Sequence, residues 1–423
     1  RKPRGVDNSK ATLADSIGSG SAVFDASSDE YIRCGVSGLS SLALGTVACW
    51  FKISGDSGGH MALFSINDES GSGDFATLRL IRGSETSYTI SARVHNEGSS
   101  LLYPTNSTNV MDNKWHHIAW VVGSSSNKIY LDGAELTLSY SEGSQSSSTQ
   151  KFFSDVADAD VFAIGSTKGT NPANEFEGNI AQVGVWSAAL TQEQIQSISQ
   201  KTYSELSTNE KTNVDGSGGA LVSWWGLDSL HGQNAVEDKN GTESLGSEIV
   251  DNGEFTGTFD TTQDYGSDFD LVTGWRVHTA GSGGSPHTAT ESDNNGSQAV
   301  RIISTSSLST NYINVRSKVA ITLTEGILYK LTFDAKKEST QTFMRIKTAS
   351  GANIAYQPVA GGLDAEVTLT DTMTTYTYYF RPTVTDTTSY IAFGRKSGDS
   401  ASNFTIDNIS LKTVTGSNVG VLL

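Results

Sequence analysis

The stretch that decides the fold is Val47-Ala48-Cys49-Trp50-Phe51-Lys52-Ile53, in which Val47, Cys49, Phe51 and Ile53 share one face. This period-two alternation is typical of a strand with one buried side. Similar apolar segments, separated by Gly, Ser, Asn and Asp, lie on both sides of it. Lys128-Ile129-Tyr130-Leu131, for example, ends on the turn signal Asp132-Gly133. Long amphipathic helical patterns are nearly absent, so the sequence predicts an all-β protein.

The strand-like segments fall into two sets, which predicts two β-sandwich (jelly-roll) domains in tandem. One short helix is expected in the first set, where Thr191 can cap it and Gln194, three residues later, completes a capping box. Leu328 to Ala335 is the clearest strand of the second set. The predicted divisions are a first domain at 1–228, a linker at 229–246, a second domain at 247–413 and a C-terminal tail or docking segment at 414–423.

The net charge argues against several classes of partner. With 29 Lys and Arg against 46 Asp and Glu, the 423 residues carry a formal charge of −17. Binding to nucleic acid or to an anionic membrane surface requires clustered basic residues, so neither is expected. No apolar run approaches the roughly 18 residues of a membrane span, so no membrane insertion is expected. The acidic balance fits an extracellular surface and leaves carboxylates available for calcium.

The two cysteines and the first residues leave two questions open. Cys34 and Cys49 lie in adjacent predicted strands, and the sequence does not decide whether they pair. So few cysteines make a fold that depends on disulfides unexpected. The chain opens on Arg1-Lys2-Pro3, which predicts that it is processed or is part of a longer protein.

Six ordered motifs in the first domain resemble the laminin-G/concanavalin-A-like lectin superfamily, a jelly-roll sandwich. They are Phe24 to Ile32, Ala48 to Lys52, Asn113 to Ala119, Ile129 to Gly133, Phe176 to Ile180 and Trp186 to Thr191. Members of that superfamily commonly carry acidic residues directly after the last isoleucine, where this chain has Ala181-Gln182. The chain therefore departs from the calcium pattern of the family at that position.

The second domain is similar to the carbohydrate-binding modules grouped as families 4, 9 and 22. The resemblance is carried by Val250 to Phe255, Thr273 to Trp275, Gly296 to Val300, Tyr329 to Lys336 and Thr405 to Leu411. Such modules often hold a structural calcium ion between their opening segment and final strand. The resemblance implies Asp407, Glu254 and the carbonyl of Gly296 as its ligands, because Ca²⁺ binds carboxylate and carbonyl oxygens.

Carbohydrate binding requires an aromatic platform for the sugar ring and polar groups for its hydroxyls. The second domain offers Trp275, Tyr312, Tyr356 and Tyr379 as platforms, with Arg345 and Gln357 as polar partners. The alternative is packing in the core, and it is favoured for Trp275, which is the sole tryptophan of its domain. Tyr379 alternates with the inward-facing Tyr378 and Phe380, so it is expected on the opposite face.

No set of residues for catalysis is recognised. Gly55-Asp56-Ser57-Gly58-Gly59 spells a serine-hydrolase motif, but no histidine precedes Ser57 and no helical pattern follows it. A surface turn is the favoured interpretation. Adjacent His116 and His117 would point to opposite faces of a strand and cannot share a metal. Asp155, Asp158 and Asp160 are interpreted as a solvated loop, with calcium as the alternative.

These observations favour a non-catalytic protein that binds glycans or cell-surface polysaccharide as an adhesion component. By analogy, we expect a phage virion appendage, a tail or capsid fibre or decoration, with an extracellular or virion-surface location and other assembly subunits as partners. One alternative is a purely structural subunit whose apolar end, Val419 to Leu423, docks a neighbour. The other is a secreted accessory part of a polysaccharide-degrading system.

Overall fold

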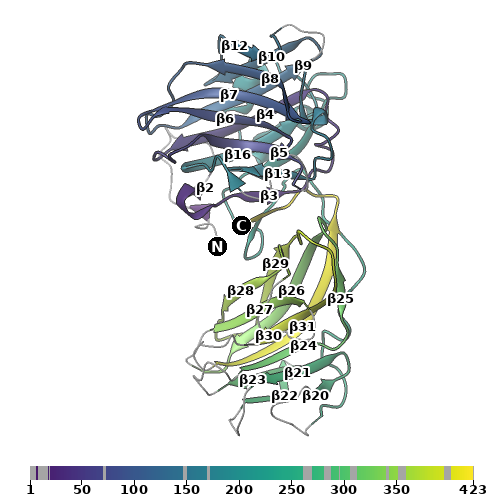
Figure 1. Cartoon of the computed structure of the whole chain (residues 1–423). Helices are drawn as coiled ribbons and strands as arrows, with labels where there is room; N and C mark the ends of the chain where they lie inside the picture. The colour runs from purple at the N-terminus through teal and green to yellow at the C-terminus, as the bar shows by residue number, and fades with distance from the viewer. Residues whose placement is uncertain are drawn as a thin grey trace. The chain divides into compact units, whose positions relative to one another are not determined.

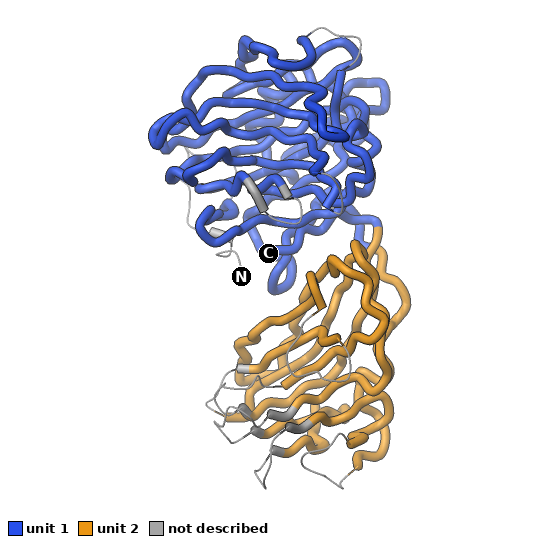
Figure 2. The backbone as a smooth tube through the Cα atoms, viewed as in Figure 1, with its two compact units in different colours: residues 1–243, 416–423 blue, residues 244–415 orange. Residues whose placement is uncertain are grey.

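The computed structural model describes residues 6–7, 18, 20–69, 73–145, 150–168, 172–260, 269–280, 287–294, 296–304, 312–339, 343–350, 359–394 and 402–422. The chain forms two compact units (Figure 2). Unit 1 consists of Arg1–Glu243 together with Gly416–Leu423, and unit 2 is Ser244–Thr415. Both are built almost entirely from antiparallel strands, which confirms the all-β prediction.

Unit 1 contains two antiparallel sheets (Figure 1), here named sheet A and sheet B. In the described residues, sheet A runs in the order β1 (Val6–Asp7), β2 (Ser21–Phe24), β16 (Gly178–Trp186), β4 (Gly45–Ile53), β9 (His116–Gly123), β10 (Ser126–Leu131) and β11 (Ala134–Glu135), with β17 (Leu221–Trp225) also paired to β16. Sheet B runs in the order β12 (Ser139–Glu142), β8 (Ser99–Asn106), β7 (Ser87–Asn96), β6 (Phe75–Ser84), β5 (Met61–Asn67), β13 (Val161–Ile164), β3 (Ile32–Cys34), β32 (Gly420–Leu422) and β18 (Ala235–Val236). A two-stranded ladder joins β14 (Thr167–Lys168) and β15 (Pro172–Ala173).

The main core of unit 1 is formed by the alternating residues of both sheets. From β4, the predicted inward set Val47, Cys49, Phe51 and Ile53 is at most 1% exposed. Burial of each such large apolar side chain stabilises the fold by about 1.5–3 kcal/mol. Cys49 lies on sheet A and Cys34 on sheet B; both are buried, and they form no disulfide with each other.

A second apolar layer covers the other face of sheet A. Helix α1 (Gln192–Ile198) begins at the predicted cap Thr191, whose hydroxyl accepts from the Gln194 amide, and it buries Ile195 and Ile198. A further helix, α2 (Thr208–Thr212), was not predicted, because five residues give too short a pattern to recognise. Short 3₁₀ turns lie at Ala26–Ser28, Phe153–Asp155 and Tyr203–Glu205. Neither α-helix in the described chain has the length and apolar character of a membrane-spanning helix.

Residues 229–243 and 416–423 belong to unit 1, which differs from the predicted linker and tail. β18 and β32 pair with each other, and β32 also pairs with β3. Asp238, 1% exposed, accepts hydrogen bonds from the backbone amides of Trp224 and Asn418. Two segments far apart in sequence thus complete sheet B together. Residues 229–243 contain few large apolar side chains, which concealed this role.

Unit 2 contains two sheets, here named sheet C and sheet D. In the described residues, sheet C runs in the order β22 (His287–Asn294), β23 (Ser297–Ser304), β31 (Ser402–Thr415), β26 (Leu328–Lys337) and β29 (Thr374–Phe380), with β19 (Ser244–Leu245) paired to β31. Sheet D runs in the order β20 (Phe269–Val272), β21 (Trp275–Ala280), β24 (Tyr312–Ser317), β30 (Asp386–Gly394), β27 (Phe343–Ser350) and β28 (Asp364–Thr368), with β25 (Ile321–Leu323) paired to β30. Tyr329, Leu331, Phe333 and Ala335 of β26, within the predicted strand Leu328 to Ala335, are at most 2% exposed in the core of unit 2.

Candidate functional site

Two of the predicted sugar platforms are fully buried. Trp275 packs against Phe255 and Phe393, and its indole N–H donates to the Asn252 carbonyl at 2.8 Å. The favoured packing interpretation of Trp275 is therefore confirmed. Tyr379 lies outside the main core cluster, as expected from its alternation, and the Lys330 ammonium is 5.3 Å from its ring centre. Neither ring has exposed surface, so the structure corrects their assignment as open platforms.

Two of the other predicted sugar-binding residues, Tyr312 and Arg345, belong to strands of sheet D. Tyr312 belongs to β24 and Arg345 to β27, the two strands that flank β30 in the described chain. The Arg345 guanidinium contacts the Asp364 carboxylate at 2.6 Å. Tyr356 and Gln357 lie outside the described residues. Tyr312 and Arg345 thus lie on two strands of sheet D that β30 separates.

Sheet D also presents a cation and a ring that were not predicted. The Arg316 guanidinium carbon lies 4.5 Å from the centre of the Tyr390 ring. Arg316 is 4% exposed and Tyr390 is half-buried. Arg316 follows the core residue Val315 and Tyr390 precedes the core residue Ile391, so strand alternation indicates that both point away from the core.

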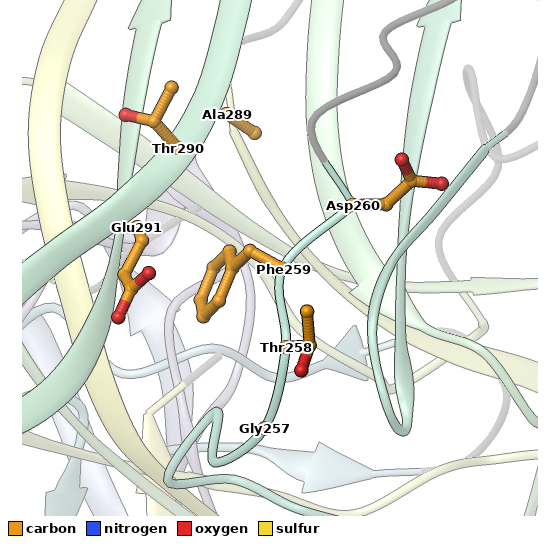
Figure 3. A pocket seen from close by; sticks show the side chains of 7 residues that line it. All are labelled: Gly257, Thr258, Phe259, Asp260, Ala289, Thr290 and Glu291. Carbon is orange, nitrogen blue, oxygen red and sulfur yellow. The ribbon is translucent and has the colours of Figure 1, made fainter.

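A pocket in unit 2 has a volume of about 500 Å³, within the usual range for small-molecule sites. It lies between the segment after Phe255 and strand β22 (Figure 3). Figure 3 shows the Phe259 ring directed toward the strand that carries Thr290 and Glu291. Its lining residues are Gly257, Thr258, Phe259, Asp260, Ala289, Thr290 and Glu291.

Gln298 fixes the shape of this pocket. Its side-chain carbonyl accepts from the Gly257 amide at 2.8 Å, and its amino group donates to the Gly257 carbonyl at 3.0 Å. The same amino group donates to Glu291 Oε1 at 2.8 Å. One side chain on β23 therefore ties the loop wall to the strand wall. The sequence did not reveal this, because Gly257 and Gln298 are 41 residues apart.

Asp407, the principal predicted calcium ligand, lies at the centre of a polar cluster. It is fully buried, and its Oδ2 accepts from Asn294 Nδ2 at 2.9 Å and from Ser297 Oγ at 3.1 Å. Its Oδ1 accepts from the Asn408 amide at 2.8 Å. These donors are all neutral, and burial raises the pKa of the Asp407 carboxyl. A buried carboxylate near a second one, Asp334, fits a site that gains from a cation.

The two other predicted calcium ligands lie beside this cluster in the chain. Gly296 directly precedes Ser297, and Gly253, which precedes Glu254, accepts a hydrogen bond from the Ile409 amide. Glu254 and Gly296 are exposed. No group of three or more His, Cys, Asp or Glu suited to a metal occurs in the described residues. Any calcium site here would therefore depend on amide, hydroxyl and carbonyl oxygens around Asp407.

The fold of unit 1 agrees with its similarity to known proteins. Residues 25–196 match a protein-family model described as the concanavalin A-like lectin/glucanases superfamily. Unit 1 is similar to this lectin superfamily. No curated protein matches the chain.

Solved structures give weaker similarities. A sialidase module of Ruminococcus gnavus, titled as CBM40, is 14% identical, with 38% of this chain and 86% of that chain covered and a TM-score of 0.33. A structure titled "CBM4 structure and function" is 25% identical over 33% of this chain and 94% of that chain, with a TM-score of 0.25. Tailspike protein 2 of an Escherichia coli O157:H7 bacteriophage is 14% identical, with 55% of this chain and 30% of that chain covered and a TM-score of 0.37. At these TM-scores, the similarities assign no function to this chain.

In the lectin-like unit, the serine-hydrolase motif forms a turn. Ser57 Oγ donates to the Gly59 carbonyl and lies 3.3 Å from the Tyr88 hydroxyl. The Arg82 guanidinium contacts Asp56 through two bonds of 2.7 and 2.6 Å, which holds the pKa of that carboxyl well below its usual range. His60 accepts from the Arg82 amide. None of these contacts gives Ser57 a histidine base.

The other polar motifs of the lectin-like unit also have structural partners. Gln182 occupies the position where the family carries acidic residues, and its side-chain carbonyl accepts from the Trp224 indole at 3.0 Å. His117 is buried, whereas His116 contacts Asp112 and Asp132 at 3.1 and 2.8 Å. Asp155 accepts from the Phe152 amide, and Asp160 accepts from the Glu69 amide.

Proposed function

We propose that this chain is a non-catalytic carbohydrate-binding protein and that the pocket of unit 2 is a sugar-binding site. The observation that carries the proposal is this pocket, in which an aromatic ring lies among carboxylate and hydroxyl groups. The lectin-like fold of unit 1 supports the same class of function.

The chemistry of the pocket suits a polyhydroxyl ligand. Glu291 and Asp260 can accept hydrogen bonds from sugar hydroxyls, while Thr258 and Thr290 can both donate and accept. Phe259, only 9% exposed, offers an apolar edge against which the C–H groups of a sugar ring can pack. A volume of about 500 Å³ accommodates one or two sugar units.

We expect Glu291→Gln combined with Thr290→Val to weaken glycan binding at least tenfold, because each removes an acceptor for a sugar hydroxyl. Binding would be measured on a glycan array and by calorimetry with the strongest hit. Glu366→Gln is the matched control, because Glu366 is an exposed glutamate on β28, outside the pocket. Unchanged affinity in the double variant would exclude the pocket as the site.

The proposed setting is an extracellular or virion surface, with a phage tail or capsid appendage as our specific proposal. The chain would then present its glycan sites from a larger assembly. The purely structural alternative loses one of its supports, because Val419 and Val421 are at most 2% exposed and are used within unit 1. Negative-stain microscopy of the parent particle with a chain-specific antibody tests this proposal.

We also propose a structural calcium ion at Asp407. If it binds, calcium at about 100 times its dissociation constant should stabilise the fold by about 2.7 kcal/mol. The melting temperature should therefore be higher in calcium than in chelator, and Asp407→Asn should remove this difference. Asp371→Asn is the control, because the Asp371 side chain is 86% exposed. Identical melts in calcium and chelator would reject the ion.

A further inference from the structure

A group of cationic and aromatic side chains lies on the face of sheet B that points away from the core. The neighbouring core residues Leu78 and Leu80 on β6, and Ala92 and Val94 on β7, establish this alternation. Strands β6, β7 and β8 lie side by side (Figure 1). The group, here named the arginine cluster, consists of Phe75, Arg79, Arg93, His95, Ser100 and Tyr103.

The Tyr103 ring is shared by two guanidinium groups. The guanidinium carbons of Arg79 and Arg93 each lie 5.4 Å from its centre. Arg79 Nη2 donates to the Tyr103 hydroxyl at 3.0 Å, and Arg93 donates to Ser100 Oγ at 2.7 and 3.0 Å. Arg93 also lies 5.6 Å from the centre of the Phe75 ring. Both arginines are therefore held in place by neutral partners.

The charge of Arg79 has no compensating carboxylate among the described residues. Arg79 is 5% exposed, and its Nε is buried without a hydrogen-bond partner. Burial lowers the pKa of Arg79, and the charge of Arg93 acts in the same direction. A buried cation with no anion beside it is costly. It is all the more unexpected in a chain with a formal charge of −17.

The remaining ionisable groups nearby do not neutralise the pair. His95 stacks on Phe75, and its Nδ1 lies 3.7 Å from Asp74 Oδ1, beyond hydrogen-bond distance. Asp74 Oδ1 accepts from the Glu97 amide at 2.8 Å. Burial lowers the pKa of the His60 imidazole, and the nearby positive charge of Arg79 lowers it further.

We propose that Arg79 and Arg93, with the Tyr103 ring between them, bind the anionic group of an acidic saccharide. The inference rests on the proposed carbohydrate-binding function and adds a second site with a defined ligand class. Guanidinium groups bind carboxylates through two parallel hydrogen bonds, so a uronate or a similar sugar acid matches the pair. Arg93, which is less buried, makes the direct contact. Arg79 raises the local positive potential, and its hydrogen bond to the Tyr103 hydroxyl can be replaced by one to the ligand.

The first test compares acidic with neutral glycans on an array at fixed ionic strength. We expect binding of acidic glycans to fall at least tenfold in Arg93→Gln and in Arg79→Met. Lys52→Gln is the matched control, because it removes one positive charge from sheet A of the same unit. Binding of neutral glycans through unit 2 should be unchanged in all three variants.

The outcomes separate this inference from the proposed function. Hits that are all neutral, or acidic hits that survive both arginine substitutions, overturn the arginine site and leave the pocket of unit 2 in place. A blank array overturns the proposed function. In that case the arginine site is tested by the melting temperature in sodium glucuronate, compared with sodium chloride at equal ionic strength. A rise in melting temperature in the wild type but not in Arg93→Gln supports the site, and no rise overturns it.

A measurement without ligand distinguishes binding from a structural role. Arg79→Met removes a buried charge but keeps most of the volume, so its melting temperature should equal or exceed that of the wild type. A fall of several degrees would show that Arg79 stabilises sheet B, and it would overturn the proposal.

Discussion

Deletion of the last eight residues, Gly416–Leu423, is expected to unfold unit 1, although these residues follow unit 2 in the chain. β32 lies between β3 and β18 in sheet B, and Val419 and Val421 are at most 2% exposed. Loss of two buried valines and the strand pairing should cost about 5 kcal/mol or more, which is comparable with the whole stability of a domain.

The side chain of Asn418 adds to this effect. It bridges to Ser37 by accepting from its amide and donating to its carbonyl, each at 2.9 Å. The backbone carbonyl of Asn418 accepts from the Trp225 indole N–H, also at 2.9 Å. Deletion would leave the buried Trp225 indole N–H without its acceptor, and an unsatisfied buried group costs about 1–3 kcal/mol.

Tryptophan fluorescence is the appropriate measurement, because six of the seven tryptophans belong to unit 1. A red-shifted spectrum and a lost unfolding transition are expected for the deleted chain. Val421→Ser should reproduce part of the loss. Val384→Ser, at a valine that is 45% exposed in unit 2, should have little effect. If the deleted chain melts like the wild type, β32 is not required for unit 1.

Acidification is expected to destabilise unit 1 through His117. This imidazole lies on β9 and is 4% exposed, and its ring centre is 5.5 Å from that of Trp50. Burial lowers the pKa of His117 to about 4, against 6.5 in the unfolded chain. Because the unfolded state then binds the proton more readily, stability falls as the pH drops from about 6.5 to 4. The loss should reach about 3 kcal/mol.

The measurement is the free energy of unfolding by denaturant at pH 7.5 and at pH 4.5. His117→Gln should reduce the difference between the two values by most of this amount. His116 acts in the opposite direction. Asp132 and Asp112 raise the pKa of His116, so its pairs stabilise the fold below the unfolded pKa and are lost as the pH rises through the folded one. His116→Gln should therefore steepen the acid loss. An equal pH difference in wild type and His117→Gln would contradict the assignment.

The sequence predicted individual strands better than it predicted sites. Alternation placed Val47, Phe51, Leu331 and Phe333 in the cores, because a strand with one buried face imposes period two. The same rule placed Tyr379 on the opposite face from Tyr378. It could not show that Tyr379 is covered there, because exposure depends on what packs over a face.

The pocket and the arginine cluster were missed for related reasons. Gly257 and Gln298 meet through a pairing of strands that no local pattern encodes. Arg79 and Arg93 alternate with apolar residues on β6 and β7, a pattern that does not show the two arginines to be adjacent. Cross-strand register decides such neighbours, and register follows from the packing of the whole sheet.

The sequence alone determined the class of the fold, the helix capped by Thr191 and the division into two sandwiches, because these depend on interactions close in the chain. The tertiary structure alone decided that Gly420–Leu422 completes the sheet of unit 1, and that Asp407 meets Asn294 and Ser297. Those contacts join residues more than one hundred positions apart. They form because buried strands need partners for their backbone groups and buried carboxylates need donors, wherever the chain can supply them.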